Sequence, residues 1–155
     1  MITKANILTL ALLSCVATTD ALAEESECYD AEVSASIISQ TPTVMPNCGE
    51  DCIIMRWPWI LEIDVQDIHF GEVPTGPLMV LSVQHTDIRG DLGVLRWKLR
   101  HNAQGGLNAV GILGGGPQRH CSVDEEPARA FITPPTGDSL DDLLREGRQR
   151  YGRDN

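Results

Sequence analysis

Alternating apolar and polar residues, interrupted by glycine- and proline-rich turns, most constrain the fold of this chain. After Trp59, the residues Leu61, Ile63 and Val65 fall on one side of an extended segment and polar residues fall on the other. This is the two-residue period of a half-buried strand. Five segments are predicted as strands, namely 31–39, 59–70, 78–86, 94–101 and 107–113. Because most of their connections are of hairpin length, we predict a mainly β protein with a small antiparallel barrel or sandwich.

The carboxyl-terminal end is the segment with helical character. Ser139 suits the N-cap of a helix, and Asp142 follows it three residues later as in a capping box. The apolar residues of this helix, which we expect to dock on the barrel, are Leu140, Leu143 and Leu144.

The amino terminus has the layout of a secretory signal peptide. Lys4 precedes an apolar run that is too short to span a bilayer, and Ala21-Leu22-Ala23 forms a small-x-small cleavage signal. The predicted divisions are a signal peptide over 1–23, a disulfide-tied barrel domain over 24–135 and a C-terminal helix and tail over 136–155.

We therefore expect a periplasmic or secreted protein with no transmembrane segment. The alternative is a lipid anchor, because Leu-Leu-Ser-Cys at residues 12–15 resembles a bacterial lipobox whose Cys15 would be lipidated.

The chain is acidic, with a formal net charge of −10. A general nucleic-acid binder needs the opposite balance, because neutralising phosphates supplies most of its affinity. This class of function is excluded, and we expect a protein or a small anionic ligand as the partner.

Four cysteines remain after signal cleavage, namely Cys28, Cys48, Cys52 and Cys121. An even number in an exported chain indicates two disulfides. A bond from Cys28 or Cys52 to Cys121 is favoured, because closing a long loop restrains the unfolded chain most. A bond between Cys48 and Cys52 is the alternative, since Gly49 allows a tight turn there.

The competing interpretation is a thiol- or metal-dependent enzyme centred on Cys48, Cys52, His120 and Cys121. The Cys-x3-Cys spacing differs from the Cys-x2-Cys of paired zinc ligands and of thioredoxin-like motifs. An oxidising compartment also converts thiols into disulfides before a metal can bind. Structural disulfides are therefore predicted, with no metal and no cofactor.

Three positive residues, Arg96, Lys98 and Arg100, form what we call the basic stripe; they alternate with apolar residues that should enter the core. One explanation is cross-strand pairing with Glu62 and Asp64, in which each pair contributes roughly 0.2–1 kcal/mol.

The other explanation is a binding face in which the basic stripe, bordered by His101, holds an anion, because guanidinium groups suit carboxylates and phosphates. Structural pairing is favoured, and Arg96, Lys98, Arg100 and His101 are the candidate binding residues.

No catalytic motif identifies an enzyme. The sequence contains none of the HExxH, GxSxG, Walker or GxGxxG patterns. His85 lies near Asp87, but no nucleophile accompanies them. The sequence thus predicts no catalytic residue and indicates a non-enzymatic binding or interaction module.

The order of the predicted strands resembles the OB-type barrel of secreted netrin-like and metalloproteinase-inhibitor-like domains. The resemblance rests on Cys28 followed by AEVSASIIS, on ILEIDVQDIHFGEVPTGPLMVLSV, on RWKLRHNAQGGLNAV and on Cys121. It implies an OB-like barrel and a binding role. The inhibitors of that family bind a protease's zinc through a cysteine at the first mature position. Here residues 24–27 precede Cys28, so that mechanism is not carried over.

Overall fold

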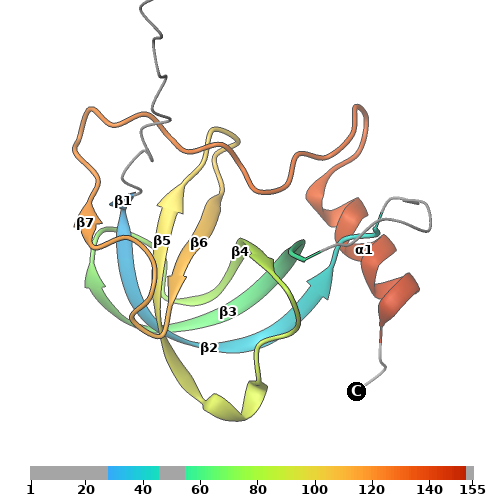
Figure 1. Cartoon of the computed structure of the whole chain (residues 1–155), viewed down its shortest axis with the longest axis horizontal. Helices are drawn as coiled ribbons and strands as arrows, with labels where there is room; N and C mark the ends of the chain where they lie inside the picture. Colours follow the sequence, from blue (N-terminus) through green and yellow to red (C-terminus); the bar gives the residue numbers. More distant parts are fainter. Residues whose placement is uncertain (1–27, 46–54, 153–155) are drawn as a thin grey trace, which may run out of the picture.

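Five strands close into a barrel, and one helix packs beside it (Figure 1). The computed structural model describes residues 28–45 and 55–152, so the predicted signal peptide, Cys15, Cys48 and Cys52 lie outside the described residues. The elements are β1 (Cys28–Tyr29), β2 (Ala31–Pro42), β3 (Trp57–Phe70), β4 (Gly76–Gln84), a short 3-10 helix η1 (Gly90–Leu92), β5 (Val94–His101), β6 (Leu107–Ile112), β7 (Arg119–His120) and α1 (Leu140–Tyr151).

The strand order around the barrel is β2-β3-β4-β6-β5. Four neighbouring pairs are antiparallel, and the barrel closes through a parallel contact of β4 with β6 at Leu81 and Asn108. The prediction of a mainly β, OB-like barrel with a short C-terminal helix is confirmed. The parallel closing pair is the departure from a wholly antiparallel barrel, and it arises because β6 returns to β4 after pairing with β5.

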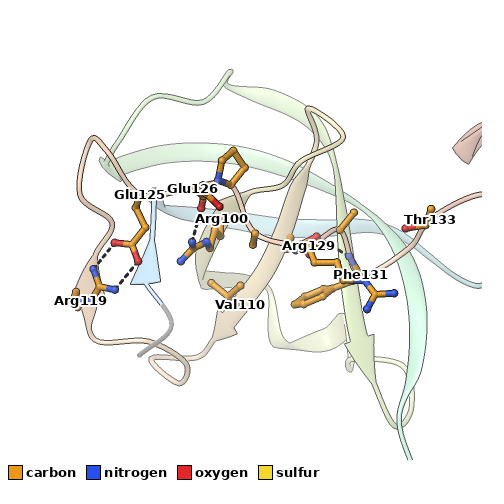
Figure 2. A pocket seen from close by; sticks show the side chains of 12 residues that line it. Arg100, Val110, Arg119, Glu125, Glu126, Arg129, Phe131 and Thr133 are labelled. Carbon is orange, nitrogen blue, oxygen red and sulfur yellow. Dashed lines mark hydrogen bonds and ion pairs between the residues drawn. The ribbon is translucent and has the colours of Figure 1, made fainter. Parts of the chain in front are cut away.

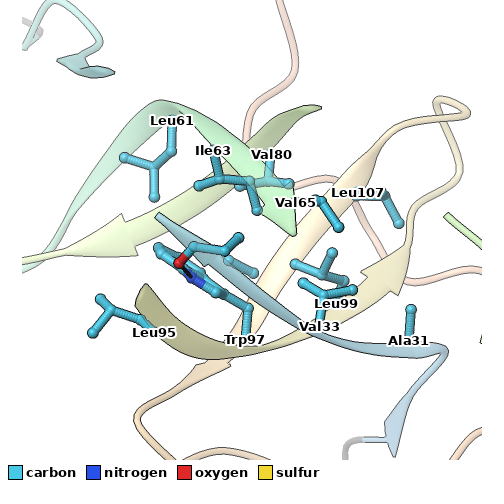
Figure 3. Close-up of a cluster of buried hydrophobic side chains, with 12 residues drawn as sticks. Ala31, Val33, Leu61, Ile63, Val65, Val80, Leu95, Trp97, Leu99 and Leu107 are labelled. Carbon is cyan, nitrogen blue, oxygen red and sulfur yellow. Dashed lines mark hydrogen bonds between the residues drawn. The ribbon is translucent and has the colours of Figure 1, made fainter. Parts of the chain in front are cut away.

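The barrel interior is filled by the apolar positions of the alternating segments (Figure 3). Leu95, Trp97 and Leu99 of β5 point inward, as predicted, and are almost fully buried. The Trp97 indole Nε1 donates a hydrogen bond of 3.0 Å to the Ala35 carbonyl, which satisfies the one polar atom of this large side chain. The members of β3 predicted to face the core, Leu61, Ile63 and Val65, are also buried.

Helix α1 covers a second, smaller apolar cluster outside the barrel. Leu140, Leu143 and Leu144 pack with Ile60 and Leu81, which confirms the predicted docking. The predicted capping box is also present: the Asp142 amide donates to Ser139 Oγ at 3.2 Å, and the Ser139 amide donates to Asp142 Oδ2 at 2.9 Å. The start of the helix is thus fixed by local chemistry and its position by apolar burial.

A disulfide joins Cys28 of β1 to Cys121, just after β7. It links residues separated by 93 positions, with Cα atoms 4.9 Å apart. It is one of the pairings that the sequence favoured. In the chain-entropy description, a loop of this length restrains the unfolded chain by on the order of 4 kcal/mol.

Gly147 allows α1 to approach the end of β2 closely. A Cβ atom at this position would lie 2.4 Å from the Pro42 carbonyl oxygen and 2.8 Å from Thr41 Cγ2. Glycine inside a helix costs about 1 kcal/mol relative to alanine, so this residue is explained by close packing and not by helix propensity.

We therefore expect Gly147→Ala to lower the free energy of unfolding by roughly 1–3 kcal/mol, although alanine is the better helix former, because the new methyl group overpacks the contact with Pro42. Urea unfolding followed by circular dichroism measures the change. Gln149→Ala, on the exposed side of the same helix, is the control and should be nearly neutral. A Gly147→Ala protein as stable as the parent would contradict the close contact.

Candidate functional site

The first member of the basic stripe is engaged in an ion pair on the sheet surface. Arg96 Nε donates to Glu32 Oε1 at 2.8 Å across the β2–β5 pair. The hydrogen bond from Arg96 is the main reason that the pKa of Glu32 lies below its ordinary value, with burial acting in the opposite direction. Cross-strand pairing was predicted here with Glu62 and Asp64, but β2 lies between β3 and β5 and supplies the acid instead.

The second member of the basic stripe, Lys98, is buried, with 6% of its surface exposed. Its Nζ donates to the Pro117 carbonyl at 2.6 Å and lies 5.0 Å from the centre of the Tyr29 ring. The glycine-rich turn before Pro117 packs on β6: a Cβ on Gly116 would lie 2.2 Å from the Val110 carbonyl oxygen. This face of β5 is therefore covered at Lys98 and is not a continuous solvated surface.

Arg100 has different partners from Arg96. Its Nη2 donates to the Glu126 carbonyl at 2.8 Å, and its Nη1 contacts the Cys28 sulfur. The neighbouring His101 has an exposed side chain, and its backbone amide donates to Asp30 Oδ2 at 2.6 Å. Arg96, Lys98 and Arg100 thus alternate with the buried residues of β5 on its outer face, but each already has a partner within the protein, so they do not form a continuous exposed cationic surface.

Arg100 lies on the floor of a hollow of about 1000 Å³ on the outer side of β5 and β6 (Figure 2). The rest of the floor is Asn108 and Val110, and the walls come from residues 119–133, which we call the wall segment. In Figure 2 the Arg119–Glu125 pair marks one end, Phe131 and Thr133 lie toward the other, and Arg100 lies between them. Three arginines face two glutamates around the hollow, so its lining is positive on an acidic protein.

A fully buried amide, Asn108, holds the wall segment against the barrel. Its Nδ2 donates to the Arg129 carbonyl at 2.8 Å, and its Oδ1 accepts from the Phe131 amide at 3.2 Å. The same Oδ1 accepts from Asn102 Nδ2 at 3.1 Å. A satisfied buried network of this kind fixes geometry strongly, because every partner would be costly to leave unpaired.

Asn102 extends this network into the loop between β5 and β6. Its Oδ1 accepts from the amides of Gln104 and Gly106, each at 3.1 Å. The Ala128 amide donates to the His101 carbonyl at 3.0 Å, and the Ala103 amide donates to the Ala128 carbonyl at 2.9 Å. The hairpin loop and the wall segment are consequently held together by backbone as well as side-chain hydrogen bonds.

The other end of the wall segment is tied by the disulfide at Cys121 and by an ion pair. Arg119 donates to both oxygens of Glu125, at 2.7 and 2.8 Å. Hydrogen bonds from Arg119 and from the Ser122 amide lower the pKa of Glu125 to about 2. The wall segment therefore remains in place at neutral pH through covalent and charged contacts.

Two further groups of side chains have chemical potential outside the lining of the hollow. Ser34 Oγ and His69 Nε2 are 2.7 Å apart on the exposed face of β2 and β3, a distance suited to proton transfer. His120 stacks on Phe70, with ring centres 3.6 Å apart, and Tyr29 meets both rings edge-on. The aromatic group borders the Arg119 end of the hollow, where Arg119 Nη1 donates to the His120 carbonyl at 3.4 Å, and we interpret it as packing beside the disulfide.

The residues proposed for a metal or thiol centre are not brought together in the described part of the chain. The Cys121 sulfur is bonded to Cys28, while Cys48 and Cys52 fall outside the described residues. Within 28–45 and 55–152, no group of three or more His, Cys, Asp or Glu residues is arranged to hold a metal ion. No helix in these same ranges is both long enough and apolar enough to cross a bilayer.

No protein-family model, curated protein or solved structure matches this chain. The lining of the hollow is therefore the feature from which a function can be inferred.

Sequence reasoning identified Arg100 but missed Asn108, Arg129 and Phe131. A signal was present in residues 128–132, where exposed Arg129 and half-buried Phe131 alternate with more buried neighbours as in a strand. The segment is short and follows a proline, so its alternation was not recognised as an ordered wall.

Asn108→Leu should lower the free energy of unfolding by roughly 3 kcal/mol or more, because it leaves the Phe131 amide, the Arg129 carbonyl and the Asn102 amide without their partner. Urea unfolding measures the loss, and amide chemical shifts of residues 128–131 report the displaced wall. The control is Gln118→Leu, which removes an exposed amide and should change stability little. Equal effects of the two substitutions would refute the role given to Asn108.

The Glu125 carboxyl should titrate near pH 2 in the folded protein, well below its ordinary value of 4.5. Because the folded-state pKa is the lower one, the pair with Arg119 stabilises the wall segment above about pH 4.5 and loses this contribution as the pH falls toward 2. Carboxyl carbon chemical shifts followed by NMR measure the titration. Arg119→Gln should move the pKa of Glu125 back toward 4.5, and an unchanged titration in that variant would contradict the assignment.

Proposed function

We propose that this chain is an exported, non-enzymatic binding module that holds a small anionic ligand in the hollow above β5 and β6. The observation that carries the proposal is the position of Arg129. Its side chain lines the hollow, and no hydrogen bond or ion pair joins it to another group among residues 28–45 and 55–152. A guanidinium placed in this way is suited to an anion supplied from outside.

Arg100 supports the same conclusion from the floor. Two of the N–H groups of its guanidinium are used within the protein, on Glu126 and Cys28, and the others have no partner in the described part of the chain. The volume of about 1000 Å³ is at the upper end of the range for small-molecule sites. A concave site of this volume is better suited to a small ligand than to the flat surface of a partner protein.

Export is supported by the signal-peptide layout of residues 1–23 and by the Cys28–Cys121 disulfide, because such bonds persist in oxidising compartments. The net charge of −10 opposes long polyanions. We place the function in the periplasm or outside the cell, with a small anion as the partner.

A thermal-shift screen of small carboxylates, phosphates and sulfates at low ionic strength tests this proposal, on protein from an exporting host whose disulfides are checked by intact mass. At least one class should raise the melting temperature in proportion to its occupancy, since a ligand that binds only the folded state stabilises it. Arg129→Gln should abolish the shift. Arg150→Gln, on the exposed surface of α1, removes the same charge elsewhere and should preserve it. A parent protein that responds to no anion, or a shift that survives in Arg129→Gln, would refute the proposal.

A further inference from the structure

The charges around the hollow limit the charge of its ligand. Arg119 is already paired with both oxygens of Glu125, and Glu126 places a second carboxylate at the rim. Of the three lining arginines, Arg129 is thus the one whose guanidinium has no acidic or carbonyl partner within the described ranges. The lining as a whole holds three arginines and two glutamates, a formal charge of +1, which favours an anion of single charge over a dianion or a polyanion.

The surface beside Arg129 is apolar. Phe131 is half-buried and lines the same hollow two residues further on, with Val110 on the floor and Pro127 and Ala130 in the wall. An aromatic ring that remains partly exposed in a concave site provides area for an apolar ligand body at little conformational cost. The site therefore joins one cationic fork to one apolar surface.

The geometry points to a monocarboxylate on an apolar body as the ligand class, with Arg129 pairing with the carboxylate and Phe131 with Val110 contacting the body. This inference rests on the proposed function, since it names the ligand of the same hollow. Two sources share this chemistry, namely a free small acid and the carboxyl terminus of a peptide that ends in an apolar residue.

The backbone at the two contacting residues is held in position before any ligand arrives. Asn108 accepts from the Phe131 amide and donates to the Arg129 carbonyl, so one buried side chain sets the backbone at both residues. Gln104 Nε2 donates to Thr133 Oγ1 at 3.1 Å, which ties the far end of the hollow to the hairpin loop. Because this backbone is already fixed, binding has to order the Arg129 side chain but not the segment that carries it, which lowers the entropic cost of binding.

Binding is measured by amide and arginine Nε chemical shifts during titration with phenylpropionate, phenylpropionamide, phenyl phosphate, and the peptide Ala-Ala-Phe with a free or an amidated carboxyl terminus. Phenylpropionate should bind and shift signals of Arg129 and Phe131, while its amide should bind at least about tenfold more weakly. Arg129→Gln should weaken the binding of phenylpropionate by about tenfold or more. Arg129→Lys should retain only part of the affinity, because an ammonium group lacks the two-pronged geometry of the guanidinium.

The variant Phe131→Leu keeps an apolar side chain in the wall but removes the ring. It should reduce the preference for phenylpropionate over acetate by several-fold and leave the affinity for acetate nearly unchanged. Arg150→Gln is the matched charge control and should bind like the parent. If Phe131→Leu changes the affinities for phenylpropionate and for acetate by the same factor, the assignment of the apolar contact is wrong.

The outcomes separate the ligand class from the proposed function. Binding of phenyl phosphate at Arg129 without binding of either carboxylate would overturn the monocarboxylate and leave an anion-binding module. Binding of none of these anions would overturn both. If the free-ended peptide binds more tightly than phenylpropionate and its amide does not bind, the inference holds with a peptide terminus as the source; the reverse order supports it with a small acid.

Discussion

The barrel depends on the narrow contact through which β4 and β6 close it, where Leu81 meets Asn108. Because β4 and β6 are paired at a single position, their contact needs support from outside the sheet. The Asn108 side chain provides this support through its hydrogen bonds to Arg129 and Phe131 of the wall segment. Leu81 also supports this strand pair, because it belongs to the apolar cluster against which Leu143 of α1 packs. The closure of the barrel and the shape of the hollow consequently share Asn108, so a substitution there is expected to affect both.

The five barrel strands were predictable because each has its own local signal, whereas the two-residue strands β1 and β7 were not predicted. Alternation in β3 and β5 and the capping box of α1 depend only on neighbours in the sequence, and all three were identified in advance. The neighbour of β5 was not, because register and strand order follow from contacts between distant segments. Glu32 and Glu62 are equally suitable partners for Arg96 when only sequence is considered, and the barrel order selects Glu32.

The candidate site was predictable only in part, for a related reason. Arg100 was predicted as a member of the basic stripe, but the three residues of the stripe have different surroundings. Arg96 pairs with Glu32, Lys98 is buried against Pro117, and Arg100 lines the hollow. The residues that complete the hollow come from a segment without a strong period. Their placement is decided by hydrogen bonds to a buried asparagine, and a buried asparagine cannot be distinguished from a loop asparagine by its type.

The two anchors of the wall segment differ in when they form. Asn108 can hold residues 129 and 131 as soon as the barrel closes, whereas the link at Cys121 requires an oxidant and joins positions separated by 93 residues. A newly synthesised chain in a reducing compartment can therefore close its barrel before the hollow has its full wall. Oxidation of Cys28 and Cys121 then completes the end of the wall segment at Arg119, while the backbone at residues 129 and 131 is already set by Asn108.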